Sequence, residues 1–211
     1  MHRHHKNVVT AGTPLPEAEK AMVMVHGRGA TAGSILEIAG HLQVEGFALL
    51  APQANANTWY PFSFMAPVAQ NEPGLSTALE VLEMIVQDIT AAGIKLENTY
   101  FLGFSQGACL VSEYLARNAR KYGGAFLYSG GVPGEQIGRP NYRGDFGGTP
   151  ILLGCSDVDA HVPLHRVQDT ASIFKEMGAE VTERIYANAP HTIFQDEIDI
   201  TNHILSGAVA R

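Results

Sequence analysis

The chain has 211 residues, of which 45% are apolar and 17% charged, and its formal net charge is −7. This length suits one globular domain with a full hydrophobic core, and the composition excludes a disordered chain. The acidic balance and the lack of a long basic run argue against nucleic acid and anionic membrane surfaces as partners.

The chain carries no evident signal for membranes or for an oxidising compartment. Its first twenty residues lack a signal-peptide core, and no apolar run approaches the ~18 residues that span a bilayer. Only Cys109 and Cys155 are present, and neither lies in a CxxC pair. We therefore expect a cytoplasmic protein without stable membrane insertion.

Residues 1–211 are expected to form a single domain. Residues 1–20 would be an N-terminal extension that could add an edge strand. The cluster of His2, Arg3, His4 and His5 is expected to be solvated, as histidine-rich chain ends usually are.

Strand-like and helix-like segments alternate from residue 21 onward. Short apolar runs predict strands at residues 21–26, 47–51, 99–103, 125–128, 151–154 and 181–186. The segments between and after them predict helices at residues 34–42, 75 to about 93, 106–121, 163–177 and 193–204. Long loops are expected at residues 53–73 and 130–148. This alternation predicts an α/β fold, a mostly parallel sheet covered by helices on both faces, with no separate lid domain.

The pentapeptide Gly-Phe-Ser-Gln-Gly at residues 103–107 lies at the carboxyl end of a predicted strand, where such sheets carry their sites. A G-x-S-x-G sequence between a strand and a helix exposes its serine as a nucleophile, here Ser105. Gly103 and Gly107 would let strand and helix pass closely. A glycine-rich turn with a helix-capping serine gives the same pattern, so the motif needs partners.

Suitable partners follow later strands in the order serine, acid, histidine. Asp157 and Asp159 come after the strand at 151–154, and His191 follows the strand at 181–186. His191 would take the proton from Ser105, and one aspartate would orient the imidazole. The negative charge of the other aspartate would interact favourably with the dipole of the helix that begins near Pro163.

Two backbone N–H donors are needed to bind the negative charge that develops on the carbonyl oxygen. One is expected from Gln106, the residue after the nucleophile. The other is expected from the turn His-Gly-Arg-Gly at residues 26–29, which follows an earlier strand.

Together these motifs resemble the phospholipase/carboxylesterase family of α/β-hydrolases, which includes acyl-protein thioesterase-like enzymes. The resemblance runs from about residue 22 to the C-terminus. It rests on HGRG at 26–29, GFSQG at 103–107, DAHVP at 159–163, Pro190-His191 and the tryptophan of TWYPF, Trp59.

The resemblance implies Ser105 as nucleophile, Asp159 as acid and His191 as base. It also implies the N–H groups of Arg28 and Gln106 as the oxyanion hole. Asp159 is preferred to Asp157 because it begins the D-x-x-V-P stretch that holds the family's acid.

Arg28 departs from the family pattern, in which thioesterase-like members often have an apolar residue. Its guanidinium would either face the cleft and favour anionic substrates or be solvated at a loop tip. The long loop at 53–73 supplies the candidates for substrate binding, which are Trp59, Tyr60, Phe62 and Met65.

The leading hypothesis is a serine hydrolase that cleaves small-molecule carboxylic esters or thioesters through an acyl-enzyme, with no cofactor and no metal. Without a lid, the cleft should suit short or exposed acyl groups. One alternative is a catalytically silent ligand-binding protein of the same fold. Another is a metal site built from Asp157, Asp159, His161 and His165. The oligomeric state stays open between a monomer and a homodimer.

Overall fold

Seven strands form one sheet in a computed structural model that describes residues 3–207. Their order across the sheet is β1-β3-β2-β4-β5-β6-β7, and only β1 is antiparallel to its neighbour. The strands are β1 (Val8–Gly12), β2 (Lys20–Val25), β3 (Phe47–Pro52), β4 (Thr99–Phe104), β5 (Gly124–Tyr128), β6 (Pro150–Ser156) and β7 (Glu180–Tyr186).

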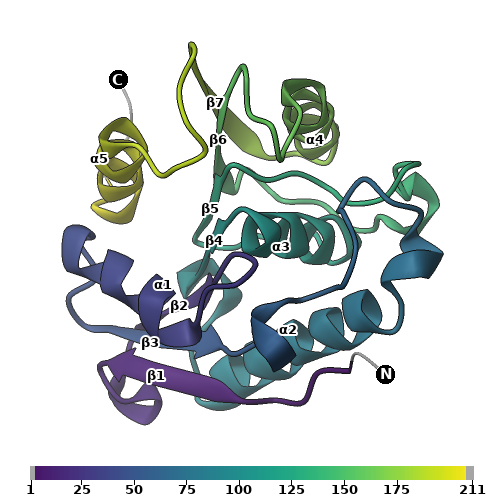
Figure 1. The fold of residues 1–211 in the computed structure, drawn as a ribbon. Coiled ribbons are helices and arrows are strands. Elements are labelled where there is room, and N and C mark those ends of the chain that lie inside the picture. Colours follow the sequence, from purple (N-terminus) through teal and green to yellow (C-terminus); the bar gives the residue numbers. More distant parts are fainter. Residues whose placement is uncertain (1–2, 208–211) are drawn as a thin grey trace.

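Helices cover both faces of the sheet, with α1 and α5 on one face and α2, α3 and α4 on the other (Figure 1). The expected mostly parallel α/β sheet is therefore confirmed. The helices are α1 (Ala32–Leu36), α2 (Gly74–Ala91), α3 (Gln106–Arg117), α4 (Leu164–Glu176) and α5 (Gln195–Leu205). Short 3₁₀ turns lie at Leu15–Glu17, Glu37–His41, Asn55–Asn57, Val68–Asn71, Leu96–Asn98 and Arg139–Asn141.

Burial on both faces explains why the central strands are apolar throughout. In β2 the side chains of residues 21–25 are all inaccessible to solvent. Ala21, Val23 and Val25 pack into the layer under α2, α3 and α4. Met22 and Met24 pack into the opposite layer, under α1 and α5. Because side chains alternate along a strand, a strand that feeds two cores has no position left for a polar residue.

Two predicted helices differ in extent. Helix α3 ends at Arg117 instead of residue 121. Ala119 lies outside the helix because its N–H donates to Arg143 O, at 3.0 Å, instead of to a carbonyl of the helix. The helix predicted at 34–42 is α1 followed by a 3₁₀ turn at Glu37–His41. Gly33 and Gly40 are poor helix formers, which accounts for this irregular segment.

The N-terminal segment is docked against the core instead of being solvated throughout. His4 is only 5% exposed, and its Nε2–H donates to Trp59 O at 2.7 Å. Its Nδ1 accepts the Asn55 N–H at 3.2 Å, so both ring nitrogens are satisfied. The expectation of a solvated histidine cluster is therefore wrong for His4, whereas His2 lies outside the described residues.

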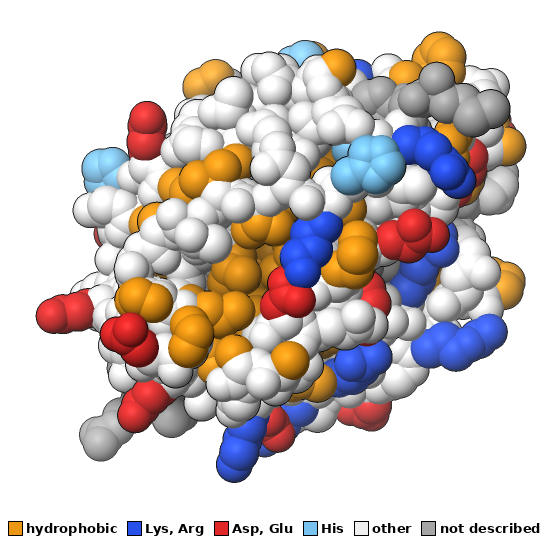
Figure 2. Space-filling model, turned by 90° about the horizontal axis from the view of Figure 1, so that it is seen from below, with side chains coloured by type: hydrophobic (Ala, Val, Ile, Leu, Met, Phe, Trp, Pro, Cys, Tyr) orange, Lys and Arg blue, Asp and Glu red, His pale blue; other side chains and the backbone are white. Residues whose placement is uncertain are grey.

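The described surface offers no obvious membrane segment. No helix within residues 3–207 combines the length and apolar character needed to cross a bilayer. Viewed from the β1 edge, hydrophobic side chains gather in a central hollow, with acidic and basic side chains interspersed around it (Figure 2).

A carboxyl group lies buried where α5 packs on β6. Glu197 is inaccessible to solvent, and its Oε2 accepts the Phe194 N–H at 2.8 Å. Among the described residues, its Oε1 has no hydrogen-bond partner. It lies so close to Gly154 that a Cβ there would come within 1.8 Å of Oε1. Burial raises the pKa of Glu197 to about 8, the Phe194 N–H opposes the rise, and the charge of Asp196 adds to it.

The contribution of Glu197 to folding stability should therefore decrease as pH rises. The unfolded chain releases this proton near pH 4.3, whereas the folded chain holds it up to about pH 8. The stabilisation that the proton provides is thus lost between these values, by about 3 kcal/mol from pH 5 to pH 8. Replacing Glu197 by Gln keeps an acceptor for the Phe194 N–H without a charge. Urea titrations at pH 5, 6.5 and 8 should show that the free energy of unfolding changes less with pH in Glu197→Gln than in the wild type. An equal change of the free energy of unfolding with pH in both proteins would contradict a protonated, buried Glu197.

Candidate active site

A cavity of about 520 Å³ opens where β2, β4, β6 and β7 end. The structure brings Ser105, His191, Arg28 and Gln106 together in its lining, although they come from three separate chain segments and Arg28 and His191 are 163 residues apart. This is the edge at which parallel sheets of this kind carry their sites. The full lining is Gly27, Arg28, Ala30, Tyr60, Pro61, Phe62, Ser63, Phe64, Phe104, Ser105, Gln106, Cys109, Ala160, His161, Val162 and His191.

Ser105 occupies a strained turn between β4 and α3. Its backbone has φ 54° and ψ −121°, a conformation rare for a residue with a side chain. The turn is tight because two glycines allow close packing. A Cβ at Gly107 would lie 2.1 Å from Val25 O, and one at Gly103 would lie 2.7 Å from the backbone of Ala108. Strand β4 and helix α3 can therefore pack this closely only because residues 103 and 107 have no side chain. Ser105, in the turn between them, lines the cavity.

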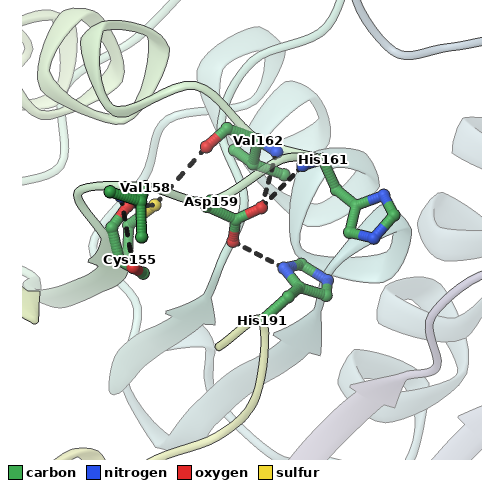
Figure 3. Close-up of polar contacts among 7 residues, drawn as sticks. Cys155, Val158, Asp159, His161, Val162 and His191 are labelled. Carbon is green, nitrogen blue, oxygen red and sulfur yellow. Dashed lines mark hydrogen bonds and ion pairs between the residues drawn. The ribbon is translucent and has the colours of Figure 1, made fainter. Parts of the chain in front are cut away.

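Asp159 and His191 form a close pair (Figure 3), and the His191 ring lies 5.0 Å from that of Phe104, the residue before Ser105. His191 Nδ1 lies 2.6 Å from Asp159 Oδ2, and since an ionised carboxylate only accepts, Nδ1–H is the donor. The Asp159 side chain is fully buried, whereas that of His191 is 18% exposed. The bond places the proton on Nδ1 and leaves Nε2 as the acceptor.

Asp159 stays ionised despite its burial. Burial alone would raise its pKa, but hydrogen bonds from His191 and from the backbone N–H groups of Val162 and His161 outweigh this effect. Those two N–H groups reach Asp159 Oδ1 at 2.9 and 2.8 Å. The pKa of Asp159 is therefore below its usual value.

The two aspartates after β6 have different partners. Asp157 is exposed, and its Oδ1 accepts the Asn188 N–H at 2.7 Å, which holds the turn that leads to His191. No group of three or more His, Cys, Asp or Glu side chains in the described part of the chain is arranged to hold a metal ion. Asp157, Asp159, His161 and His165 thus do not form the alternative metal site.

The two residues predicted to supply N–H donors, Arg28 and Gln106, both line the cavity with Ser105. Gln106 is the first residue of α3, where helix N–H groups have no partner within the helix. A Cβ at Gly27 would lie 3.4 Å from Ser105 Cβ, so the turn at 26–29 passes directly beside the serine. No described residue accepts a hydrogen bond from the backbone N–H of Arg28 or of Gln106.

The guanidinium of Arg28 is neither solvated alone nor simply directed into the cleft. Nη1 donates to Pro61 O at 3.0 Å, and Nη2 donates to Tyr60 O at 2.9 Å and to Phe62 O at 2.6 Å. Arg28 is exposed and lines the cavity, so each expectation holds in part, but neither included these carbonyl contacts, which link two loops of the cavity wall.

The residues expected to bind substrate divide into two groups. Tyr60 and Phe62 line the cavity, and Phe62 is 54% exposed at its rim. Trp59 and Met65 are not part of the lining. Trp59 is fully buried, and its Nε1–H donates to His26 O at 2.8 Å, because the indole packs beneath the 26–29 turn. Met65 packs against the core.

Two aromatic neighbours of His191 were not predicted for this site. The rings of Phe104 and His161 lie 5.0 and 4.9 Å from the His191 ring, centroid to centroid. Phe104 precedes the nucleophile in the pentapeptide and His161 follows Asp159 by two residues. Adjacency to the motifs is therefore the signal that could have identified them.

Comparison with known proteins supports a relationship over most of the chain. A model of the phospholipase/carboxylesterase family matches residues 5–207. A phospholipase/carboxylesterase from Dyadobacter fermentans has a similar structure, with a TM-score of 0.96, 48% identity and coverage of 97% of this chain and 99% of that one. A probable carboxylesterase, SOBER1-like, from Arabidopsis thaliana is 26% identical over 61% of this chain and 49% of its own length. Acyl-protein thioesterase 1 from Saccharomyces cerevisiae is 29% identical over 75% of this chain and 69% of its own. The chain thus spans about half the length of the first of these curated relatives.

Both cysteines should be inert in the folded protein. Burial raises the pKa of Cys109 to about 11 and that of Cys155 to about 12. At pH 8 the thiolate fraction of Cys109 is then about 10⁻³, and the thiolate is the reactive form. Iodoacetamide at pH 8, followed by intact-mass spectrometry, should modify neither thiol in buffer and both in urea. Rapid alkylation of Cys109 in buffer would show that the cavity wall opens.

Proposed function

Since the chain belongs to the phospholipase/carboxylesterase family, we propose that it hydrolyses carboxylic esters or thioesters by a serine mechanism. The observation that carries the proposal is the 2.6 Å bond between His191 Nδ1 and Asp159 Oδ2, on the cavity that Ser105 also lines. In the neutral imidazole, a proton on Nδ1 makes Nε2 the acceptor, which is the arrangement a general base requires.

In the proposed mechanism Ser105 Oγ attacks the substrate carbonyl while His191 Nε2 takes its proton. The tetrahedral oxyanion accepts hydrogen bonds from the backbone N–H groups of Arg28 and Gln106. His191 then protonates the leaving alcohol or thiol, and an acyl group remains on Ser105. A water molecule, deprotonated by His191, releases the acid in a second round of the same steps.

Asp159 acts through the imidazole. It holds His191 in the tautomer with the proton on Nδ1, and its charge stabilises the imidazolium that forms in each step. Its low pKa keeps this charge through the neutral range. A hydrogen bond from Ser105 Oγ to His191 Nε2 is expected to form when substrate binds, because such bonds are often long or poorly aligned in a free enzyme.

The proposed substrates are small molecules with a modest acyl group. A cavity of about 520 Å³ falls within the range of ordinary small-ligand sites. Tyr60 and Phe62 would contact the acyl or leaving group from the 53–73 loop, with Phe62 at the rim.

The nucleophile is tested by replacing Ser105 with Ala. Hydrolysis of p-nitrophenyl esters from acetate to decanoate should fall by about 10³-fold or more, because the acyl-enzyme can no longer form. A fluorophosphonate should label the wild type at Ser105, as peptide mass spectrometry can establish. Full activity in the variant would refute the serine mechanism. Absence of both turnover and labelling in the wild type would favour a silent ligand-binding protein.

The acid is tested by a matched pair of variants, Asp159→Asn and Asp157→Asn. Asparagine at 159 has no negative charge to keep the His191 proton on Nδ1 or to stabilise the imidazolium, so kcat should fall by about 10³-fold or more. Asparagine at 157 keeps an acceptor for the Asn188 N–H, so kcat should stay within about threefold of the wild type. The reverse result would assign the role to Asp157.

A further inference from the structure

We propose that the side chains of Arg28 and Gln106 are positioning residues that hold the oxyanion hole by binding one shared segment, residues 58–62. The inference rests on the proposed serine mechanism, in which the backbone N–H groups of these two residues bind the oxyanion. Each of the two residues would then have a double role, donating to the substrate with its backbone and to the protein with its side chain.

The Arg28 side chain fastens the first donor. Its guanidinium bonds to three consecutive carbonyl oxygens, those of Tyr60, Pro61 and Phe62, at 2.6–3.0 Å. Within residues 3–207, Arg28 forms no ion pair, so carbonyl oxygens are its main protein acceptors. A guanidinium is planar and has five N–H groups in fixed directions, and three carbonyls on one such group therefore define its place.

The Gln106 side chain fastens the second donor to the same segment. Its Oε1 accepts the Trp59 N–H at 2.9 Å and the Thr58 hydroxyl at 3.2 Å. Its Nε2 donates to Tyr60 O at 2.9 Å. The carbonyl oxygen of Tyr60 thus accepts hydrogen bonds from both Arg28 and Gln106, which makes it the point where the two supports meet.

The shared segment is itself held from several directions. Trp59 is buried against His26, with ring centroids 4.9 Å apart, and its carbonyl accepts the bond from His4. The Phe62 N–H donates to Asn71 Oδ1 at 2.9 Å. These contacts hold the backbone of residues 58–62 in place, so Arg28 and Gln106 bind to a fixed segment.

The 26–29 turn is consequently tethered at three successive places. His26 O accepts the Trp59 indole N–H, the Arg28 side chain binds the carbonyls at 60–62, and the Gly29 N–H donates to Asn57 O at 2.7 Å. An oxyanion hole acts only when its donors lie about 2.7–3.1 Å from the developing charge. A displacement of about 1 Å can cost ~10²-fold in rate, so tethers of this kind bear directly on kcat.

The test compares Arg28→Met, Arg28→Lys and Gln106→Met with the wild type. Arg139→Met is the matched control, because it also removes one positive charge but lies on the surface away from the cavity lining. For each protein we would measure kcat and KM for the best p-nitrophenyl ester, the fraction of Ser105 labelled by a fluorophosphonate, and Tm. We would also measure Ki for a trifluoromethyl ketone and for the corresponding secondary alcohol. The ketone forms a tetrahedral oxyanion on serine, whereas the alcohol does not.

A positioning role predicts losses confined to the transition state. Arg28→Met should lower kcat by about 10–100-fold, leave KM within about twofold, and weaken the ketone by the same factor as kcat. Binding of the alcohol should not change. Arg28→Lys should recover part of the loss, because lysine can reach one or two of the three carbonyls. Arg139→Met should match the wild type.

The shared segment makes a further prediction about the double variant. If Arg28 and Gln106 act through the same segment, the loss in Arg28→Met/Gln106→Met should be smaller than the product of the two single losses. Fully multiplicative losses would mean that the two side chains act independently.

Besides fully multiplicative losses in the double variant, two results would overturn the inference alone, in a wild type that is active and labelled at Ser105. One is a kcat of Arg28→Met within twofold of the wild type. The other is equal weakening of the ketone and the alcohol, which would indicate a changed cavity shape rather than a displaced donor. A wild type that is neither active nor labelled would overturn the proposed function and this inference with it.

Discussion

The geometry of the site depends on the contact between the first turn of α3 and the carbonyl ends of β2 and β4. No side chain separates these elements, because Gly107 packs on Val25 O and Gly103 packs on the backbone of Ala108. The chain can pass from strand to helix in this space only through the strained conformation of Ser105. The same contact places the first turn of α3 at the cavity, whose lining includes Gln106 and Cys109. The strain is local, and the parallel sheet around it supplies the rigid frame that can hold it.

Much of this arrangement could be predicted from the sequence, because local patterns encode it. Strands buried on both faces must be apolar throughout, so β2 to β6 could be recognised from the sequence. Ser105, Asp159 and His191 could then be identified because each follows the end of a predicted strand. The parts that could not be predicted depend on contacts between distant residues. His4 was expected in solvent because nothing near it in sequence indicates its bond to Trp59 O, 55 residues away. The early end of α3 has the same origin, since Arg143 captures the chain at Ala119.

Two buried carboxyl groups illustrate how the surroundings decide a charge. Asp159 and Glu197 are both shielded from water, yet Asp159 has a lowered pKa and Glu197 one raised to about 8. Asp159 receives hydrogen bonds from one imidazole and two backbone N–H groups, which replace the water it has lost. Glu197 receives one, from the Phe194 N–H. The number of donors that meet a buried carboxylate therefore separates an anion at the cavity from a neutral acid at a helix interface.

Within the segment at 58–62, residues 60–62 line the cavity, and their backbone carbonyls bind the side chains of Arg28 and Gln106. These two tasks use different atoms of the same residues, which has a consequence for divergence and engineering. Side-chain replacements at Phe62 can change the shape of the cavity while the carbonyl positions remain. An insertion, a deletion or a loop graft would move the carbonyls that Arg28 and Gln106 bind. If the proposed hydrolase activity holds, its acyl selectivity should evolve through point substitutions within a loop of constant length, and transplanting the loop from a relative would lower turnover.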